Sequence, residues 1–397
     1  MSSRKSALWV RHHLRLHDNP VMNSFCENSD EGMFFSLVTK SERRAKSSRK
    51  DYIEHGFQSF QARIFPHELK RYNEISELEL SLVSAQVTDL YFAQGYSPEE
   101  QSEEVIVSQL CQKLGIKLHG QFQGTLFHLN DLPFEVKKMP DVFTAFRQKI
   151  ESHQIQPLSP LAPRKLPKPI YLTQAKPQVV DLEQQALQRV EDYFKINKRV
   201  YSYKETRNGM IDYDDSTKIS SYLSLGLLSP RYVYEQLMLL PQQNDSTYWV
   251  FFELLWRDYF KFLSLKYGKK IYLNAGITGK KNVADRDEKK IDDWKNGKTG
   301  HDFIDANMRE LKFTGWMSNR GRQNVASYLI HHLGQPWTLG ASYFEEMLID
   351  YDPESNWGNW LYLSGHGTDP RSRVFNPDKQ AQDYDALGLY RKKWLSE

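Results

Sequence analysis

The feature that most constrains this chain is a proline-rich stretch near its middle. Residues 156–177 contain six prolines, namely Pro157, Pro160, Pro163, Pro167, Pro169 and Pro177. Because proline lacks a backbone N–H and fixes φ, this spacing excludes a long helix and favours extended chain. We therefore expect a linker here, between two parts of the chain that fold separately.

The residues before the linker alternate between two patterns. Short apolar runs at 7–11, 33–39, 89–93 and 117–120 predict strands, and helical patterns lie between them at 52–65, 78–84 and 103–114. Alternating strands and helices are typical of a parallel α/β sheet. We expect a Rossmann-like α/β domain over residues 1–130, followed by the linker over 131–178.

The residues after the linker have helical spacing only. Ser229 followed by Pro230, for example, is a typical helix start. Eight of the nine tryptophans lie at or beyond Trp249, and tryptophan fills cores but also stacks on bases and flat cofactors. The predicted fold class is therefore α/β plus all-α, with a parallel-sheet N-terminal domain and a larger helical domain over residues 179–397.

The composition narrows the class of protein. A length of 397 residues fits two domains, and 53 basic against 50 acidic residues leave a net charge of +3. This excludes a histone-like polycation but not a local basic patch for nucleic acid. The chain has two cysteines, no apolar run of membrane-spanning length and no apolar core after its basic start. We expect a cytoplasmic monomer without disulfides, membrane spans or a metal site.

Three segments combine polar side chains in unusual ways. The first ends in a hydroxyl-rich turn before a helix, formed by Ser216, Thr217, Lys218, Ile219 and Ser220. Free N–H groups at a helix start, hydroxyls and a lysine together suit a phosphate group. The same residues also suit an ordinary capped helix.

The second segment places Glu253, Trp256 and Arg257 at positions i, i+3 and i+4, on one face of a predicted helix. An acid, an indole and a guanidinium in an apolar helix are costly to bury unless each finds a partner. The alternative is a local pair between Glu253 and Arg257 beside a core tryptophan.

The third segment spans residues 305–360. Its polar residues are Asn319, Arg320, Arg322 and Gln323 on one helix turn, then Asp350, Asp352, Asn356 and Asn359 among Trp357 and Trp360. Amides and charges among tryptophans indicate the lining of a pocket for a flat ligand with polar edges. The two aspartates alone would also suit acid–base chemistry or a metal ion.

These segments belong to longer motifs. They read VRHHLRLHDNP, YKETRNG, STKIS, LSPR, ELLWRDYF, DANMREL, MSNRGRQNVAS, DYDPESNWGNW and FNPDKQAQDYDALGLYRKKWL. In this order, the motifs resemble the photolyase/cryptochrome flavoproteins, and specifically the cryptochrome DASH branch. The likeness covers the whole chain and is densest over residues 200–395, while the N-terminal loops and the linker are short for that family.

The resemblance implies that the helical domain binds FAD in a U-shaped conformation. The matching cofactor positions are Tyr203, Ser216, Thr217, Lys218, Ile219, Ser220, Arg257, Asn319, Arg322, Asp350, Asp352 and Asn356. It also implies a salt bridge between Arg322 and Asp350 over the flavin ring, with Asn356 near flavin N5. The two aspartates would then tune the flavin and would not bind a metal.

The resemblance further implies light-driven repair, in which reduced FAD passes an electron to a cyclobutane pyrimidine dimer flipped out of DNA. The positions that would face the DNA are Glu253, Trp256, Asn319, Gln323, Tyr362, Arg371 and Arg373, and the catalytic ones are Glu253, Trp256, Asn319, Trp337, Asn356 and Trp360. Gln323 and Tyr362 stand where double-strand photolyases tend to have methionine and tryptophan, which favours single-stranded DNA. The alternatives are a blue-light receptor and a nucleic-acid-binding flavoprotein without repair.

Two further expectations come from the resemblance. Relatives carry an antenna, commonly 5,10-methenyltetrahydrofolate, held by a glutamate that Glu99 or Glu100 would match. They also reduce FAD through three tryptophans, of which Trp360 and Trp337 match the inner and middle ones. The outer position falls on Ala284, so we expect this route to be shortened unless another aromatic residue ends it.

Overall fold

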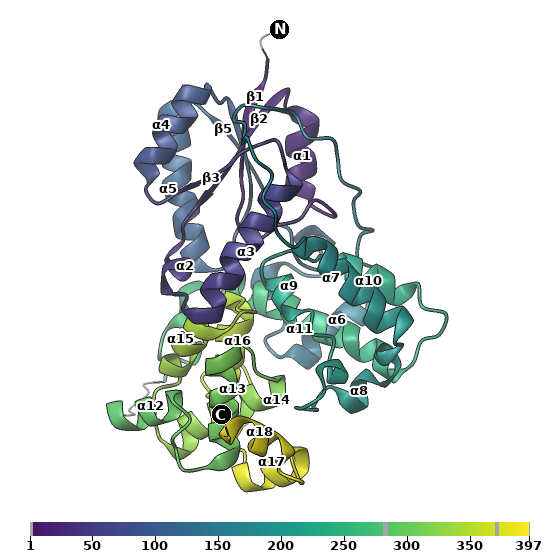
Figure 1. The fold of residues 1–397 in the computed structure, drawn as a ribbon, viewed down its shortest axis with the longest axis vertical. Coiled ribbons are helices and arrows are strands. Elements are labelled where there is room, and N and C mark those ends of the chain that lie inside the picture. Colours follow the sequence, from purple (N-terminus) through teal and green to yellow (C-terminus); the bar gives the residue numbers. More distant parts are fainter. Residues whose placement is uncertain (1–2, 281–284, 370–372, 397) are drawn as a thin grey trace.

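The computed structural model describes residues 3–280, 285–369 and 373–396. Ala284 and Arg371, two positions that the sequence singled out, lie outside the described residues. The first part of the chain forms a parallel sheet covered by helices, and the rest is helical (Figure 1). The predicted fold class is therefore confirmed.

The sheet has the strand order β3-β2-β1-β4-β5. The strands are β1 Lys5–Trp9, β2 Glu31–Leu37, β3 Leu69–Tyr72, β4 Asp89–Ala93, β5 Lys117–Gln121 and β6 Lys168–Pro169, which pairs with β2. The four predicted strands are present. The sequence does not predict β3 and β6, because β3 is short and mostly polar and β6 has only two residues within the proline-rich segment.

Different helices cover the two faces of the sheet. They are α1 Pro20–Asn28, α2 Lys40–Arg44, α3 Ser47–Arg63, α4 Ile75–Ala85 and α5 Pro98–Leu114. Alternation along β1 sends Ala7 and Trp9 to the face that packs on α4 and α5, and sends Leu8 and Val10 to the face that packs on α1 and α3. The second of these apolar clusters continues into the helical part, so the two parts of the chain share a core.

The proline-rich segment is extended, as expected. It lies between α6 (Phe143–Ser152) and α7 (Leu182–Glu191), and residues 155–180 contain no helix. Figure 1 shows this segment passing from the sheet to the helical part along the outside of the molecule. The domain boundaries at residues 130 and 178 stay predictions.

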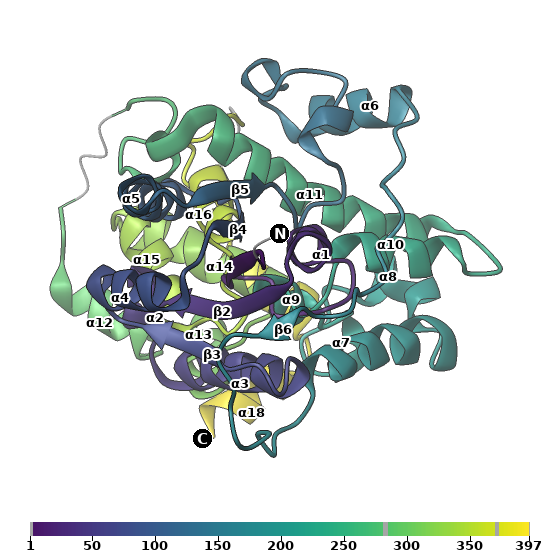
Figure 2. The same cartoon turned by 90° about the horizontal axis from the view of Figure 1, so that it is seen from above.

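The helical part is built around one long helix, α11. Its remaining helices are α8 Tyr203–Thr206, α9 Ser220–Ser224, α10 Pro230–Met238, α12 Glu288–Lys295, α13 Asp302–Thr314, α14 Asn319–Ser327, α15 Trp337–Met347, α16 Pro353–Leu363, α17 Pro377–Tyr384 and α18 Leu389–Leu395. α11 (Asp245–Tyr267) packs against α8, α16 and α6, and Figure 2 shows α6 beside it at the edge of the molecule. Among the described residues, none of these helices has the length and apolar character needed to cross a membrane.

Candidate functional site

The two charged residues of the polar face predicted on α11, Glu253 and Arg257, have different partners. Glu253 forms an ion pair of 2.5 Å with Arg207, which follows α8. Arg257 instead donates to the carbonyl of Gly124 and lies 3.3 Å from Asp352. The alternative of a local Glu253–Arg257 pair is therefore wrong, because each of the two residues has a partner from another segment.

Trp256 packs against four aromatic rings, which are those of Phe143, Tyr259, Phe260 and Tyr362. Its ring stacks on Phe143 of α6 with a centroid distance of 3.7 Å and an interplanar angle of 10°. Tyr362 of α16 meets it edge to face at 5.8 Å. Phe143 therefore covers one face of a half-buried indole whose orientation is fixed by packing.

Three arginines each bind one of the side chains predicted to face the DNA. Arg373 donates to the hydroxyl of Tyr362, and Arg320 on the first turn of α14 donates to Gln323 (2.9 Å). Arg207 is the third. The buried Nε atoms of Arg207, Arg320 and Arg373 have no hydrogen-bond partner among the described residues. We call the residues Arg207, Glu253, Trp256, Arg320, Gln323, Tyr362 and Arg373 the Trp256 site.

Of the predicted DNA-facing residues, Trp256 contacts Tyr362 and Tyr362 contacts Arg373, while Glu253 pairs with Arg207 and Gln323 accepts from Arg320. Asn319 is exposed on the same turn of α14 as Arg320. The sequence points to Arg320 only as one of the polar residues that line a pocket, and it assigns no role to Arg207 or Phe143. Arg207 in YKETRNG and Arg320 in SNRGRQ lie in quoted motifs, but their partners are distant in the chain.

The turn before α9 has many unused hydrogen-bonding groups. Arg189 donates to the carbonyls of Ser216 (3.1 Å) and Thr217 (2.8 Å). The backbone N–H groups from Ser216 to Ile219 make no hydrogen bond to a described residue, and Lys218 adopts a left-handed backbone with φ 54°. Burial lowers the pKa of Lys218 to about 8. Consecutive unpaired N–H groups with a half-buried lysine suit a phosphate.

Arg322 and Asp350 form the salt bridge that the resemblance implies. Nη2 of Arg322 donates to both carboxylate oxygens of Asp350, at 3.0 and 2.8 Å, and its Nε donates to the carbonyl of Met317. Asn356 of α16 donates to the carbonyl of Ala341. Contacts among α14, α15 and α16 and the loop before α16 therefore fix these three side chains.

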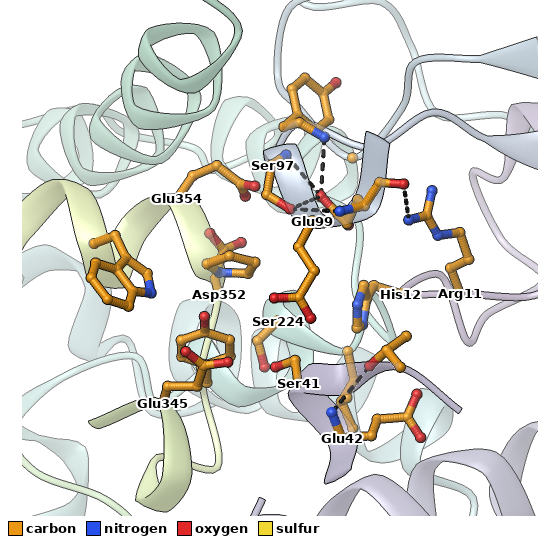
Figure 3. Close-up of a pocket in the computed structure, with 18 of the residues that line it drawn as sticks. Arg11, His12, Ser41, Glu42, Ser97, Glu99, Ser224, Glu345, Asp352 and Glu354 are labelled. Atoms are coloured by element: carbon orange, nitrogen blue, oxygen red, sulfur yellow. Dashed lines mark hydrogen bonds between the residues drawn. The ribbon is translucent and has the colours of Figure 1, made fainter. Parts of the chain in front are cut away.

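A cavity of about 460 Å³ lies between the sheet domain and the helical part. Figure 3 shows Asp352, the N-cap residue of α16, and Glu354 of α16 facing Glu99 and His12 of the sheet domain across it. Arg257 also lines it. Two residues that the resemblance gives to FAD, Arg257 and Asp352, thus form part of this wall.

The cavity wall contains a buried charge network. Nζ of Lys261 lies 2.6 Å from Glu354 and 3.2 Å from Asp352. Burial alone would raise the pKa of Asp352, but Lys261 and Arg257 outweigh it and hold that pKa below its ordinary value. Burial raises the pKa of Glu354 to about 8 in spite of Lys261.

The structure distinguishes the two candidate antenna glutamates. Oε2 of Glu100 accepts from the backbone N–H groups of Tyr96 (3.1 Å) and Ser97 (2.9 Å), closing the capping box of α5. Glu99 pairs with Arg44 at 2.8 Å, and its other oxygen is buried without a partner. Glu99 therefore has a free acceptor in the cavity wall.

The tryptophans assigned to electron transfer are buried. Trp360 packs on Trp294 at 6.2 Å and Phe344 at 5.1 Å. Trp337 packs on Trp357 at 5.8 Å, and Trp357 meets Tyr272 at 5.5 Å. Trp357 and Tyr272 both line the interdomain cavity, so aromatic rings lead from Trp337 to that cavity.

The chain matches two family models. One is described as DNA photolyase and covers residues 6–165, and the other is described as FAD binding domain of DNA photolyase and covers residues 249–397. The cryptochrome DASH of Xenopus laevis is 40% identical over 441 residues, covering 100% of this chain and 83% of that protein. The cryptochrome DASH of Synechocystis sp. PCC 6803 is 37% identical over 428 residues, covering 98% and 87%.

Two solved structures have the same fold as this chain. The Synechocystis sp. PCC6803 cryptochrome matches with a TM-score of 0.91 and 35% identity, covering 100% of this chain and 90% of that one. A class III photolyase from Agrobacterium tumefaciens matches with a TM-score of 0.84 at 22% identity, covering 100% and 87%, a likeness of fold alone. The helical part of the present chain contains the FAD-binding domain. The present chain belongs to the cryptochrome DASH branch of the photolyase/cryptochrome family.

Proposed function

We propose that this protein uses FAD and light to split cyclobutane pyrimidine dimers, mainly in single-stranded DNA. The Trp256 site is the observation that supports this most. It combines an aromatic ring backed by Phe143, a carboxylate on Glu253, and three guanidinium groups with unpartnered Nε atoms. Aromatic faces stack on bases and guanidinium groups bind phosphates, so one site suits both parts of a nucleotide.

The residues assigned to FAD fit its chemistry. The unpaired N–H groups from Ser216 to Ile219 and the half-buried Lys218 suit the pyrophosphate. Arg322, which forms a salt bridge with Asp350, provides the positive charge that an anionic reduced flavin needs. When bound, FAD supplies the light absorption and the electron; Asn356 would hydrogen-bond near its N5.

The other site residues bind and orient the substrate. Trp256 would stack on a flipped pyrimidine, and Glu253 would hydrogen-bond a base edge. Burial raises the pKa of Glu253, while Arg207 opposes the shift, so Arg207 favours the carboxylate form. Arg320, Arg373 and Arg371 would contact backbone phosphates, and Asn319 and Gln323 would face the lesion.

The single-strand preference follows from the cost of base flipping. Extruding a dimer from a duplex costs a few kcal/mol of unpairing and unstacking. A site with Gln323 and Tyr362 has fewer large apolar contacts to offset this than one with methionine and tryptophan. In a single strand there is no base pair to break, so this cost is smallest.

Repair of ultraviolet-irradiated oligo(dT) tests the proposal. We expect blue light, with FAD reduced by dithionite, to restore unmodified thymines, and to do so much faster in the single strand than in a duplex. Equal rates on both substrates would contradict the strand preference. Binding without repair would leave a nucleic-acid-binding flavoprotein, and neither binding nor repair would favour the blue-light receptor.

We also propose that the interdomain cavity holds the antenna. Glu99 has a buried acceptor oxygen without a partner there. Unsatisfied buried acceptors are costly, and the N–H groups of a pterin ring would satisfy them. 5,10-Methenyltetrahydrofolate is accordingly the proposed ligand, with Glu99 favoured over Glu100. The monomeric state and cytoplasmic location stay predictions.

FAD affinity should fall as the pH rises, because Lys218 loses its proton. An anion raises the pKa of a neighbouring lysine. FAD binding therefore takes up a proton once the pH exceeds about 8, which is the pKa of Lys218 in the protein without FAD. Affinity is therefore full below pH 8 and decreases above it, by about tenfold at most between pH 7 and 9. Fluorescence titration of FAD into apoprotein measures this, and Lys218→Arg, which stays charged, should show no such decrease.

Photoreduction should be slow because the outer tryptophan position is Ala284. If nothing replaces the outer donor, the charge-separated state recombines quickly, and dithionite should still restore repair. Transient absorption distinguishes the cases. A long-lived tryptophan radical that Trp357→Phe abolishes would show that Trp357, next to Trp337, ends the route and that the prediction is wrong.

A further inference from the structure

Of the two C-terminal helices, α17 contacts α14, which lines the Trp256 site, and α18 contacts the neighbouring helix α13. The amide of Asn324 on α14 donates to Gln380 of α17 (3.3 Å). Tyr390 of α18 donates to Glu310 of α13 (2.6 Å). The ring of Tyr384, the last residue of α17, lies under the guanidinium of Arg320, with 4.6 Å from Cζ to the ring centroid.

Arg320 has no acidic partner among the described residues. Its Nη1 donates to Gln323 (2.9 Å), its Nη2 to Asn208 (3.3 Å), and its buried Nε to nothing described. Burial lowers the pKa of Arg320; Tyr384 opposes this shift, and the nearby charge of Arg207 adds to it. Two neutral amides and an aromatic face thus hold this cation, which leaves its charge available to an anion.

We propose that Tyr384 is a positioning residue, which fixes the guanidinium of Arg320 so that it contacts a backbone phosphate of DNA bound at the Trp256 site. This inference rests on the proposed function. A guanidinium on a flexible side chain loses much rotamer freedom when it binds. The Tyr384 ring removes that cost in advance, because a cation above an aromatic face is attracted to it.

The salt dependence of binding is the readout that a merely structural role would not change. Each phosphate contact on a single strand contributes about 0.7 to the slope of log K against log salt. We would measure dark binding of irradiated oligo(dT) by fluorescence anisotropy across a salt series. Arg320→Ala should lower that slope by about 0.7, and Tyr384→Leu should lower it by most of the same amount with a threefold to tenfold weaker affinity at low salt, about the effect of a cation–π contact.

Matched variants separate positioning from folding. Tyr384→Phe keeps the ring and should bind like wild type. Tyr171→Leu removes the ring beneath Lys70 in the sheet domain and should leave the slope unchanged. The double variant Arg320→Ala/Tyr384→Leu should bind no more weakly than Arg320→Ala, since the two residues act as one unit.

The outcomes distinguish the inference from the function on which it rests. If Arg320→Ala lowers the slope but Tyr384→Leu does not, the positioning role is wrong and the DNA site stands. If wild type shows no salt-dependent binding, the proposed function fails as well. A Tyr384→Leu protein that loses FAD or thermal stability, with Tyr384→Phe also defective, would overturn the inference, because the defect would then be one of packing.

Discussion

Asp350→Asn is expected to purify with little FAD and to unfold more easily. Asp350 is nearly buried, and Nη2 of Arg322 donates to both of its oxygens. Removing one partner of a buried pair leaves an uncompensated charge, which costs about 3–5 kcal/mol. We expect the lower end of that range, because Arg322 remains about a quarter exposed at 24%. The ratio of flavin to protein absorbance and urea unfolding measure the two effects.

The chain contains a matched control. Arg391 and Asp385 form a pair of 2.9 Å in which the arginine is 30% and the aspartate 1% exposed, much like Arg322 and Asp350, but at the C-terminal helices. Asp385→Asn should lower the free energy of unfolding without emptying the flavin site. If Asp350→Asn keeps its FAD at the wild-type ratio, the assignment of this salt bridge to the flavin is wrong.

The sheet shows which parts of the fold local sequence determines. β1, β2 and β4 are apolar on both faces, since helices cover both, and each reads as a strand from the sequence. β3 has the sequence LKRY, in which Leu69 and Tyr72 fit the apolar strand pattern and the two basic residues between them do not. Its place at the edge of the sheet, beside β2, explains why polar side chains are tolerated there, and this neighbour relation cannot be read from four residues.

The site shows the same limit at the level of side chains. The spacing of Glu253, Trp256 and Arg257 correctly predicts a shared helix, but not the partners. Glu253 meets Arg207, and Arg257 meets Asp352, far along the chain. Contacts between distant segments depend on how helices pack, so spacing favoured a local pair that does not form.

The two antenna candidates illustrate what local rules settle once the backbone is known. Glu99 and Glu100 are adjacent, and the family resemblance alone does not separate them. Glu100 stands three residues after Ser97, the spacing of a capping box, and the structure shows its carboxylate used in that way. That signal was present in the sequence and would have favoured Glu99 for the ligand.

Trp256→Ala should cause the largest loss of substrate binding among single changes in the Trp256 site. Stacking of one base on an aromatic side chain is worth about 1–3 kcal/mol, which corresponds to roughly a 5- to 150-fold weaker Kd for irradiated oligo(dT). Because Phe143 backs one face of the indole, the base would use the other face. Dark binding by anisotropy measures the loss, with undamaged oligo(dT) as the reference for lesion-specific binding.

Trp256→Phe is the control, because a smaller ring still stacks on both Phe143 and a base. It should recover much of the affinity that Trp256→Ala loses, and both variants should keep FAD, since Trp256 packs on Phe143 and Tyr362, outside the turn at Ser216–Ser220. Unchanged lesion binding in Trp256→Ala would mean that the dimer does not stack on this ring. Arg207, Arg320 and Arg373 would then bind the DNA backbone alone, and the chain would be a nucleic-acid-binding flavoprotein without a lesion pocket at Trp256.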